Sequence, residues 1–388
     1  MGRYVPGGKT EVLQVTGERR WFASMSVSLL AAPFLSGCSE VNESESPLKL
    51  GEPLSIGPVG EFAFPCSSEE AEWYRRQMVP GSKKLNQGQC LHMLYLHGVD
   101  ARFEGCRIGG GKELLKLILD AKAGGQEFGQ ACFVRTRFGL RVPENARLSR
   151  SDEAHRDQTL AMLAHLGVSS VAEVHLADEV STVGEAIRDS VATFDLTTTE
   201  LEWSAWAYAL YLQQPNWRNR FGVNFSFDQM VDSLRSRSMH SASCGGTHVL
   251  LSLTMILRAN EQRRILTDRK RDELKEFLER AVIEAVRQQQ PDGSWKIDWH
   301  RELILNTEGG SLPDTPRERL IATGHIAEWL LYVPENLQPP EEIYRMSAVW
   351  LTSELRRVEE KQAELFCPFT HGLFVVIRGS SSKLRLES

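Results

Sequence analysis

Residues 322–331 have the sequence Ala-Thr-Gly-His-Ile-Ala-Glu-Trp-Leu-Leu, and they decide the fold because they predict a helix that is apolar on nearly every side. Such a helix must be buried on all its faces. The other predicted helices of this kind are 199–212, 245–259 and 369–378. Predicted helices with one charged face alternate with them along the chain: 181–192, 226–236, 268–290 and 340–361.

This alternation predicts an all-α fold, an α/α toroid whose inner helices line a central axis while its outer helices face water. A ring of about six helical hairpins would close such a body. Earlier in the chain, periodicity predicts further helices at 68–78, 88–97, 112–122 and 155–166. Residues 128–142 fit a short hairpin or an irregular arm.

Residues 286–295, Val-Arg-Gln-Gln-Gln-Pro-Asp-Gly-Ser-Trp, predict the end of a helix followed by a tight turn. Pro291 ends the helix, Asp292-Gly293 favours a turn, and Trp295 supplies a large apolar anchor. The segment resembles the Gln-Trp repeat of the terpene cyclase and prenyltransferase superfamily, in which a helix-ending Gln and a turn Trp tie neighbouring hairpins. The resemblance implies the toroid fold for residues 195–378.

The superfamily's acidic motifs are missing from the chain. It contains neither the Asp-x-Asp-Asp acid of hopene-type cyclases nor an Asp-Asp-x-x-Asp string for diphosphate and magnesium. The resemblance therefore implies a fold, and it does not imply terpene chemistry.

Length and composition fit a soluble globular protein that forms one large body. The chain has 388 residues, of which 41% are hydrophobic and 25% are charged. A net charge of -6 and a pI near 6.0 argue against a nucleic-acid partner, which would favour a basic stripe. We expect the toroid domain to span residues 58–380, followed by a tail at 381–388.

The N-terminus has the pattern of a secretory signal over residues 1–37. Arg19 and Arg20 precede a short apolar run that ends in Leu35-Ser-Gly-Cys38. This ending resembles the lipobox of bacterial lipoproteins, which implies lipidation of Cys38 and attachment to the membrane of the cell envelope through that anchor alone. Residues 38–57 are predicted to be a disordered tether. The alternative is an ordinary buried helix in a cytoplasmic protein.

Seven cysteines are present, and lipidation would use Cys38. The other six could form disulfides in an oxidising envelope. They are Cys66, Cys90, Cys106, Cys132, Cys244 and Cys367. Cys66 with Cys90 and Cys106 with Cys132 are plausible local pairs, although the sequence leaves the connectivity open.

Five histidines share one sequence context, a small or polar lead-in followed by an apolar helix: His92, His155, His248, His325 and His371. If the ring closes, His248, His325 and His371 should line one mouth of a central cavity, and His92 and His155 could join them. Three imidazoles can bind zinc and leave a position open for water, or one can act as a general base. The alternative is that each imidazole satisfies backbone groups or the neighbouring threonines.

Cys244-Gly-Gly-Thr-His248 is the sharpest local motif. Two glycines before a helix allow close approach of a ligand or another helix, and Cys244 could act as a nucleophile with a histidine partner. The alternative is a tight turn with a packed cysteine.

A second group of residues suggests sugar chemistry. The candidate acids are Glu202, Glu328, Asp195 and Asp298, and the candidate stacking platforms are Trp203, Trp206, Trp299 and Trp329. Three function classes follow: a cavity enzyme for a small hydrophobic ligand, a carbohydrate-active toroid with paired acids, and a non-catalytic binding or scaffold protein.

Overall fold

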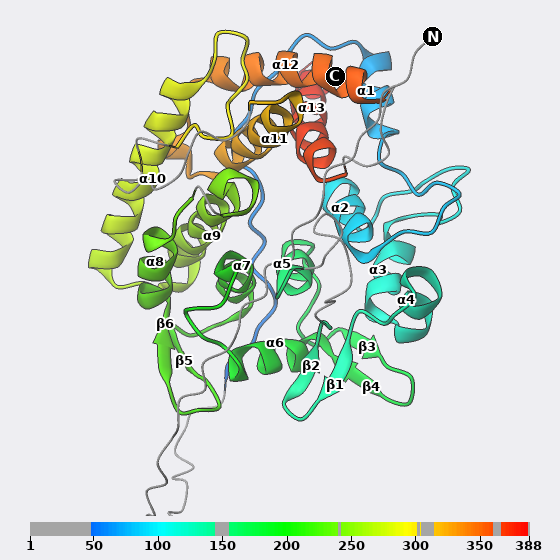
Figure 1. Cartoon of the computed structure of the whole chain (residues 1–388), viewed down its shortest axis with the longest axis vertical. Helices are drawn as coiled ribbons and strands as arrows, with labels where there is room; N and C mark the ends of the chain where they lie inside the picture. Colours follow the sequence, from blue (N-terminus) through cyan, green and yellow to red (C-terminus); the bar gives the residue numbers. More distant parts are fainter. Residues whose placement is uncertain are drawn as a thin grey trace, which may run out of the picture. The chain divides into compact units, whose positions relative to one another are not determined.

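The computed structural model describes residues 48–143, 155–239, 242–300, 303, 314–359 and 366–386, all within one compact unit (Figure 1). These residues form thirteen α-helices, so the fold is mostly helical, as predicted. The first six helices are α1 (Ser68–Arg75), α2 (Gln87–His97), α3 (Gly111–Leu119), α4 (Ala121–Phe128), α5 (Gln158–His165) and α6 (Val183–Ala192). The others are α7 (Leu201–Tyr211), α8 (Phe227–Ser236), α9 (Thr247–Arg263), α10 (Asp268–Gln288), α11 (Pro316–Tyr332), α12 (Glu341–Glu359) and α13 (Phe366–Leu386). The predicted signal and Cys38 lie outside the described residues.

Each of the twelve predicted helices is present, with ends that move by a few residues. Side-chain caps explain several starts: Ser67, Asn86 and Ser226 each form a reciprocal capping box. In α11, Thr315 caps the first turn and Pro316 occupies it, well before the predicted start at 322. The other large change is in α13, which extends to Leu386, beyond its predicted end at 378.

The sequence did not predict α4 or two of the three hairpins. In α4, Asp120 accepts hydrogen bonds from the free N–H groups of Lys122 and Ala123, which offsets two glycines inside the helix. The expected hairpin within 128–142 is formed by β1 (Val134–Thr136) and β2 (Gly139–Arg141). The others are β3 (Glu173–His175) with β4 (Val180–Thr182), and β5 (Asn216–Arg218) with β6 (Asn224–Ser226).

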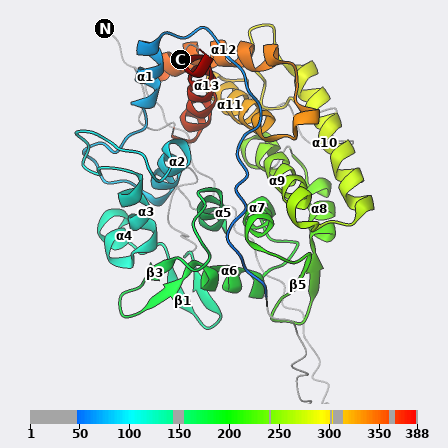
Figure 2. The same cartoon turned by 180° about the vertical axis from the view of Figure 1, so that it is seen from behind.

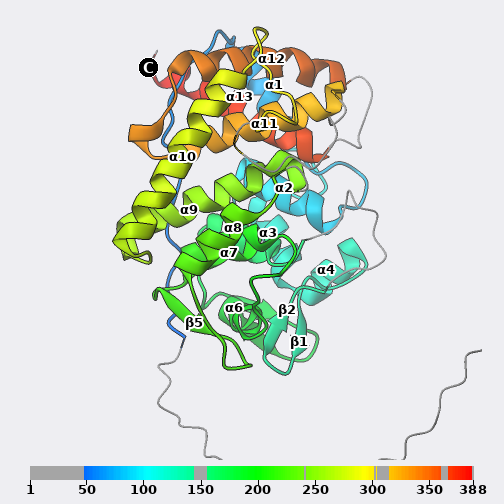
Figure 3. The same ribbon diagram turned by 60° about the vertical axis from the view of Figure 1, so that its left-hand side comes forward.

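The apolar helices pack against one another in succession. α7 contacts α5 and α9, α11 contacts α9 and α13, and α2 contacts α13 and α5. Every residue of α7 is buried, as expected for a helix that is apolar all round. The helices with charged faces lie outside this group: α10 covers α9, and α12 covers α11 and α13 (Figures 1 and 3).

The Gln-Trp segment ties three consecutive helices together. Trp295 is fully buried, and its Nε1 donates a 2.7 Å hydrogen bond to the carbonyl oxygen of Ala285 in α10. Its backbone N–H donates to Thr323 Oγ1 in α11 at 3.0 Å. Gln289 at the end of α10 donates to the carbonyl of Ile343 in α12 at 2.9 Å. The helix-ending glutamine that makes this tie is therefore Gln289.

Residues 50–60 run along the ends of two of the apolar helices (blue in Figure 2). The N–H of Leu54 donates to the carbonyl of Leu210 near the end of α7, and the N–H of Gly60 donates to that of Leu331 near the end of α11. We call this segment the strap. The part of the predicted tether from residue 48 onward thus packs on the helical unit.

Neither predicted local disulfide forms. Cys90, Cys106 and Cys132 are free thiols in this structure, which excludes both the 66–90 and the 106–132 pair. The described part of α13 extends to Leu386, so most of the predicted tail is helical.

Candidate functional site

Four imidazoles from four different helices meet in the interior. The ring centroids of His325 and His371 lie 3.8 Å apart, and those of His248 and His325 lie 5.0 Å apart. The ring of His92 lies 5.8 Å from that of His371. We call these four residues, with Cys244, the histidine cluster. The structure thus brings together four of the five histidines that the sequence singled out.

A close approach of α11 and α13 explains the shortest of these separations. A Cβ atom added to Gly324 would lie 2.8 Å from the backbone nitrogen of Gly372 and 3.2 Å from the carbonyl carbon of His371. Glycine at 324 therefore lets the backbones of α11 and α13 approach closely, which brings the imidazole of His325 next to that of His371.

Hydrogen bonds fix the tautomers of three of the imidazoles. The Nδ1 atoms of His92 and His325 lie 2.7 Å from Gly88 O and 2.9 Å from Ile321 O, respectively, and a carbonyl can only accept. His371 Nδ1 lies 2.6 Å from the Glu328 carboxylate in the same way. Each Nδ1 therefore carries a hydrogen, and the lone pair of the neutral ring is on Nε2.

Cys244 joins the cluster through an unusual backbone conformation. It has φ 53° and is followed by Gly245 and Gly246, which also have positive φ, so the chain turns sharply before α9 begins at Thr247. A non-glycine residue in this region is strained, which is typical of functional positions. One ligand atom each from Cys244, His248 and His325 lie within 4.8 Å of one another.

Glu328 is the acidic member of the site, and only 1% of it is exposed. It accepts hydrogen bonds from the Tyr95 hydroxyl and from His371. Burial raises the pKa of Glu328, but the charges of His371 and His325 and the hydrogen bonds from His371 and Tyr95 outweigh it, so the pKa is lower than usual. The carboxylate is therefore ionised and holds the imidazole of His371.

His165 is a neighbouring imidazole that the sequence did not single out, because it follows an apolar stretch at the end of α5. Its ring lies 5.0 Å from that of Tyr95, and its Nε2 lies 3.3 Å from the Tyr332 hydroxyl. Burial lowers the pKa of His165 to about 4, and the negative charge of Glu328 opposes this only partly. His165 is therefore neutral at pH 7.

His155 lies apart from the histidine cluster. Its Nδ1 is 2.5 Å from a carboxylate oxygen of Glu200, and its ring stacks on Trp203 at a centroid distance of 6.3 Å. Trp203 in turn lies 4.7 Å from the ring of His248, so a tryptophan separates the two imidazoles.

The predicted sugar-binding residues are mostly buried. Trp203, Trp206, Trp299 and Trp329 are exposed by 4%, 2%, 3% and 0%, which favours packing over sugar stacking. Among the predicted acids, Glu202 is buried, and this burial raises its pKa. Asp195 accepts hydrogen bonds from the backbone N–H and the hydroxyl of Thr197.

Only one of the three central histidines lies at the start of its helix. His248 does lie at the start of α9, but His325 lies in the middle of α11, and His371 lies one turn inside α13. The earlier start of α11 at Pro316 is the cause. The free amides of α11 therefore do not face the cluster beside His325.

Comparisons of the chain with protein-family models, curated proteins and solved structures found no match. Within the described residues, none of the helices combines the length and the apolarity needed to cross a bilayer.

Proposed function

We propose that the histidine cluster is a zinc-dependent catalytic site, with Cys244, His248 and His325 as the metal ligands. The proximity of these three donors, within 4.8 Å of one another, carries the proposal. Ligand atoms on one zinc ion are separated by about 3.5 Å, given metal–ligand bonds of about 2.0–2.3 Å. A small inward movement of the side chains would therefore complete the site.

The donor chemistry supports zinc. Thiolate and imidazole are the ligands that zinc prefers, and three protein ligands leave one position for a substrate or water, as in catalytic rather than structural sites. The Nδ1 hydrogen bond from His325 to Ile321 O resembles the outer-shell contacts that orient metal-bound imidazoles.

His371 and Glu328 supply the second part of the proposed site. Bound zinc would act as a Lewis acid, polarising a substrate carbonyl or lowering the pKa of a water molecule. The lone pair on Nε2 of His371 can accept a proton in the same space, while Glu328 holds Nδ1 and stabilises the imidazolium that results.

A thiol nucleophile at Cys244 is the second candidate. The strained φ of 53° and the place directly before α9 favour it, since nucleophiles often occupy such turns. Metal binding and nucleophilic attack both need the thiolate form of Cys244. The two candidates differ in one respect: only a thiolate that binds zinc should be protected by zinc from alkylation.

We also propose that the six apolar helices form the inner wall of an α/α toroid similar to the terpene cyclase and prenyltransferase fold. The successive contacts of α5, α7, α9, α11, α13 and α2, with α2 again touching α5, support it. An apolar interior around the histidine cluster favours a small hydrophobic ligand. The carbohydrate-active alternative predicts an activity that is lost when one of two paired acids is replaced. The scaffold alternative predicts no catalysis.

The lipoprotein-like N-terminus is proposed to anchor this unit to the cell envelope through Cys38. Growth with an alkyne fatty acid should label the natural chain, and Cys38→Ser should abolish the label. Equal labelling of the variant would contradict the anchor and favour the cytoplasmic alternative.

Metal replacement tests the catalytic proposal. The purified protein is treated with a chelator, titrated with Co²⁺, and followed by the thiolate-to-cobalt charge-transfer absorption. We expect one equivalent to bind, Cys244→Ser to lose the absorption, and Cys106→Ser, a control thiol in the loop before α3, to keep it. Failure of the natural protein to bind Co²⁺ or Zn²⁺ would sink the metal site. Alkylation of Cys244 that zinc does not slow would favour the nucleophile.

A further inference from the structure

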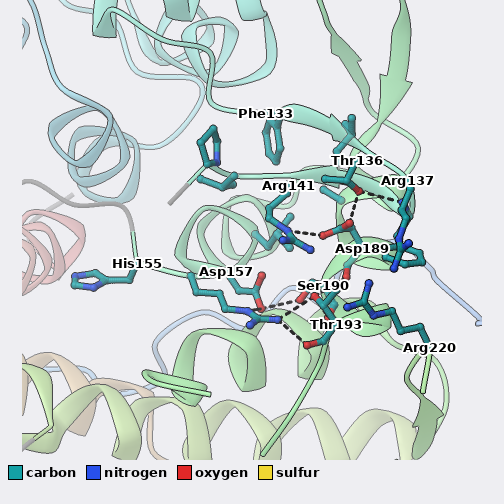
Figure 4. A pocket seen from close by; sticks show the side chains of 17 residues that line it. Phe133, Thr136, Arg137, Arg141, His155, Asp157, Asp189, Ser190, Thr193 and Arg220 are labelled. Atoms are coloured by element: carbon teal, nitrogen blue, oxygen red, sulfur yellow. Dashed lines mark hydrogen bonds and ion pairs between the residues drawn. The ribbon is translucent and has the colours of Figure 1, made fainter. Parts of the chain in front are cut away.

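A separate cavity of about 370 Å³ lies between the β1–β2 hairpin, α5, α6 and the turn after β5 (Figure 4). This volume is within the range of small-molecule pockets. Four arginines line it: Arg137, Arg141, Arg156 and Arg220. We call it the arginine cavity, and nothing in the proposed zinc chemistry uses it.

The two carboxylates in the wall of the arginine cavity are already committed to hydrogen bonds. Asp189 is 1% exposed and accepts from Arg141 Nε at 2.8 Å and from the Thr136 hydroxyl. Asp157 is 8% exposed and accepts from the Ser190 hydroxyl at 2.7 Å and from that of Ser204. These hydrogen bonds tie both carboxylates to neighbouring side chains in the wall.

Two of the guanidinium groups face the cavity without a carboxylate of their own. Arg137 and Arg220 lie over the same ring, that of Phe138, at 4.5 and 4.6 Å from its centroid. The ion pairs formed among the described residues involve neither arginine, whereas Arg141 pairs with Asp189. The aromatic ring thus gathers two cations that would otherwise repel.

The positive charge of the arginine cavity favours an anionic ligand. Four guanidinium groups face two carboxylates, which leaves two positive charges unmatched in a chain whose net charge is -6. Arg156 uses one nitrogen to donate to Thr193 O and Oγ1, both at 3.1 Å, and keeps further N–H groups for a ligand.

We propose that the arginine cavity binds a small phosphate monoester with an apolar or aromatic substituent. A phosphate monoester carries about two negative charges near pH 7 and matches the guanidinium fork in geometry. A carboxylate would neutralise only one of the two charges. The apolar side chains of Phe133, Leu160 and Ala186 in the wall provide contacts for the substituent.

Calorimetric titration with phenyl phosphate at low salt tests the proposal on the full chain. We expect binding by the natural protein and about tenfold or greater weakening in the double variant Arg137→Gln/Arg220→Gln. Arg188→Gln is the matched control, because Arg188 lies on α6 next to Asp189 but pairs with Glu185 outside the cavity. All three arginines are exposed, so thermal unfolding should show folded variants.

Each alternative result has a definite meaning. Absence of binding to the natural protein, or equal binding to the double variant, overturns the site. Benzoate has only one negative charge, so if it binds as tightly as phenyl phosphate, the inference that the ligand carries two negative charges is wrong. Inorganic phosphate binding as tightly as phenyl phosphate overturns the apolar contact. None of these results depends on metal in the histidine cluster, so the two proposals fail separately.

Discussion

The histidine cluster and the arginine cavity are made from opposite kinds of side chain. In the cluster, three of the four imidazoles have their hydrogens on Nδ1 and their lone pairs on Nε2, so they present acceptors to a cation or a proton. In the arginine cavity, guanidinium groups present only donors, and both acids in the wall already accept hydrogen bonds from neighbouring side chains. Burial with fixed tautomers suits metal chemistry, whereas open donors suit recognition of an anion. Four predictions test or refine this contrast.

Removing a ligand from the histidine cluster should have the largest effect. We expect His325→Ala to weaken zinc binding by about a hundredfold or more, since loss even of an outer-shell partner costs about ten- to a hundredfold. Competition with a chelating dye measures this affinity. The control is His175→Ala, an exposed imidazole on β3 that should leave the affinity unchanged. Equal zinc affinities of the two variants would exclude His325 as a ligand.

Glu328→Ala should destabilise the fold strongly. It leaves His371 and Tyr95 without their buried acceptor, and breaking such a buried pair costs about 3 kcal/mol of unfolding free energy. Because the pKa of Glu328 is below its usual 4.5, its contribution is present above that pH and is lost as pH falls through the folded-state value.

Urea unfolding at pH 7 measures this loss. The control, Glu342→Ala, removes an exposed partner of Arg345 and should change stability little. A change for Glu328→Ala no larger than that of the control would show that the buried contact does not stabilise the unit.

Acidification should act through His165. Its pKa is about 4 in the folded state against 6.5 in the unfolded chain, so below pH 6.5 only the unfolded chain gains the proton. Stability should therefore fall by about 2 kcal/mol between pH 7 and pH 5. His165→Gln should flatten this slope in urea unfolding, whereas His175→Gln, on the exposed surface, should keep it. A slope that His165→Gln leaves unchanged would assign the loss to other groups.

The smallest of the four expected effects is that of ionic strength, which should weaken anion binding and leave zinc binding almost unchanged. Raising the ionic strength screens exposed guanidinium groups, so phenyl phosphate should bind the arginine cavity several-fold more weakly. Zinc retention by the buried cluster should change little over the same range. Parallel calorimetry and metal analysis check this difference, and an anion affinity that does not respond to salt would argue against a guanidinium-driven site.

The sequence predicted the helices and most of the histidine cluster for physical reasons. A long apolar stretch is a local signal, so α7, α9 and most of α11 could be predicted. The Ser226 cap is another local signal, and it marks the start of α8. The repeated histidine context identified four residues that the structure brings together. It also included His155, which a tryptophan separates from the cluster.

Other features depended on contacts that no local pattern records. The hairpin strands are three residues long, too short for alternation to be seen. The roles of Tyr95 and His165 arise only when α2, α5 and α11 pack together. The four arginines of the arginine cavity lie between positions 137 and 220 of the sequence. The net charge of the chain is negative, so it gives no indication of a local excess of positive charge.

The strap is bound by side chains from two further helices of the unit. Arg258 and Arg263 in α9 donate to the carbonyls of Gly57 and Glu52, and Arg378 in α13 donates to that of Pro58. Main-chain bonds from the strap to α7 and α11 and guanidinium bonds from α9 and α13 thus join four helices to one segment. Deleting residues 50–60 would remove these bonds together with those to α7 and α11, so the strap should contribute to the stability of four helices at once.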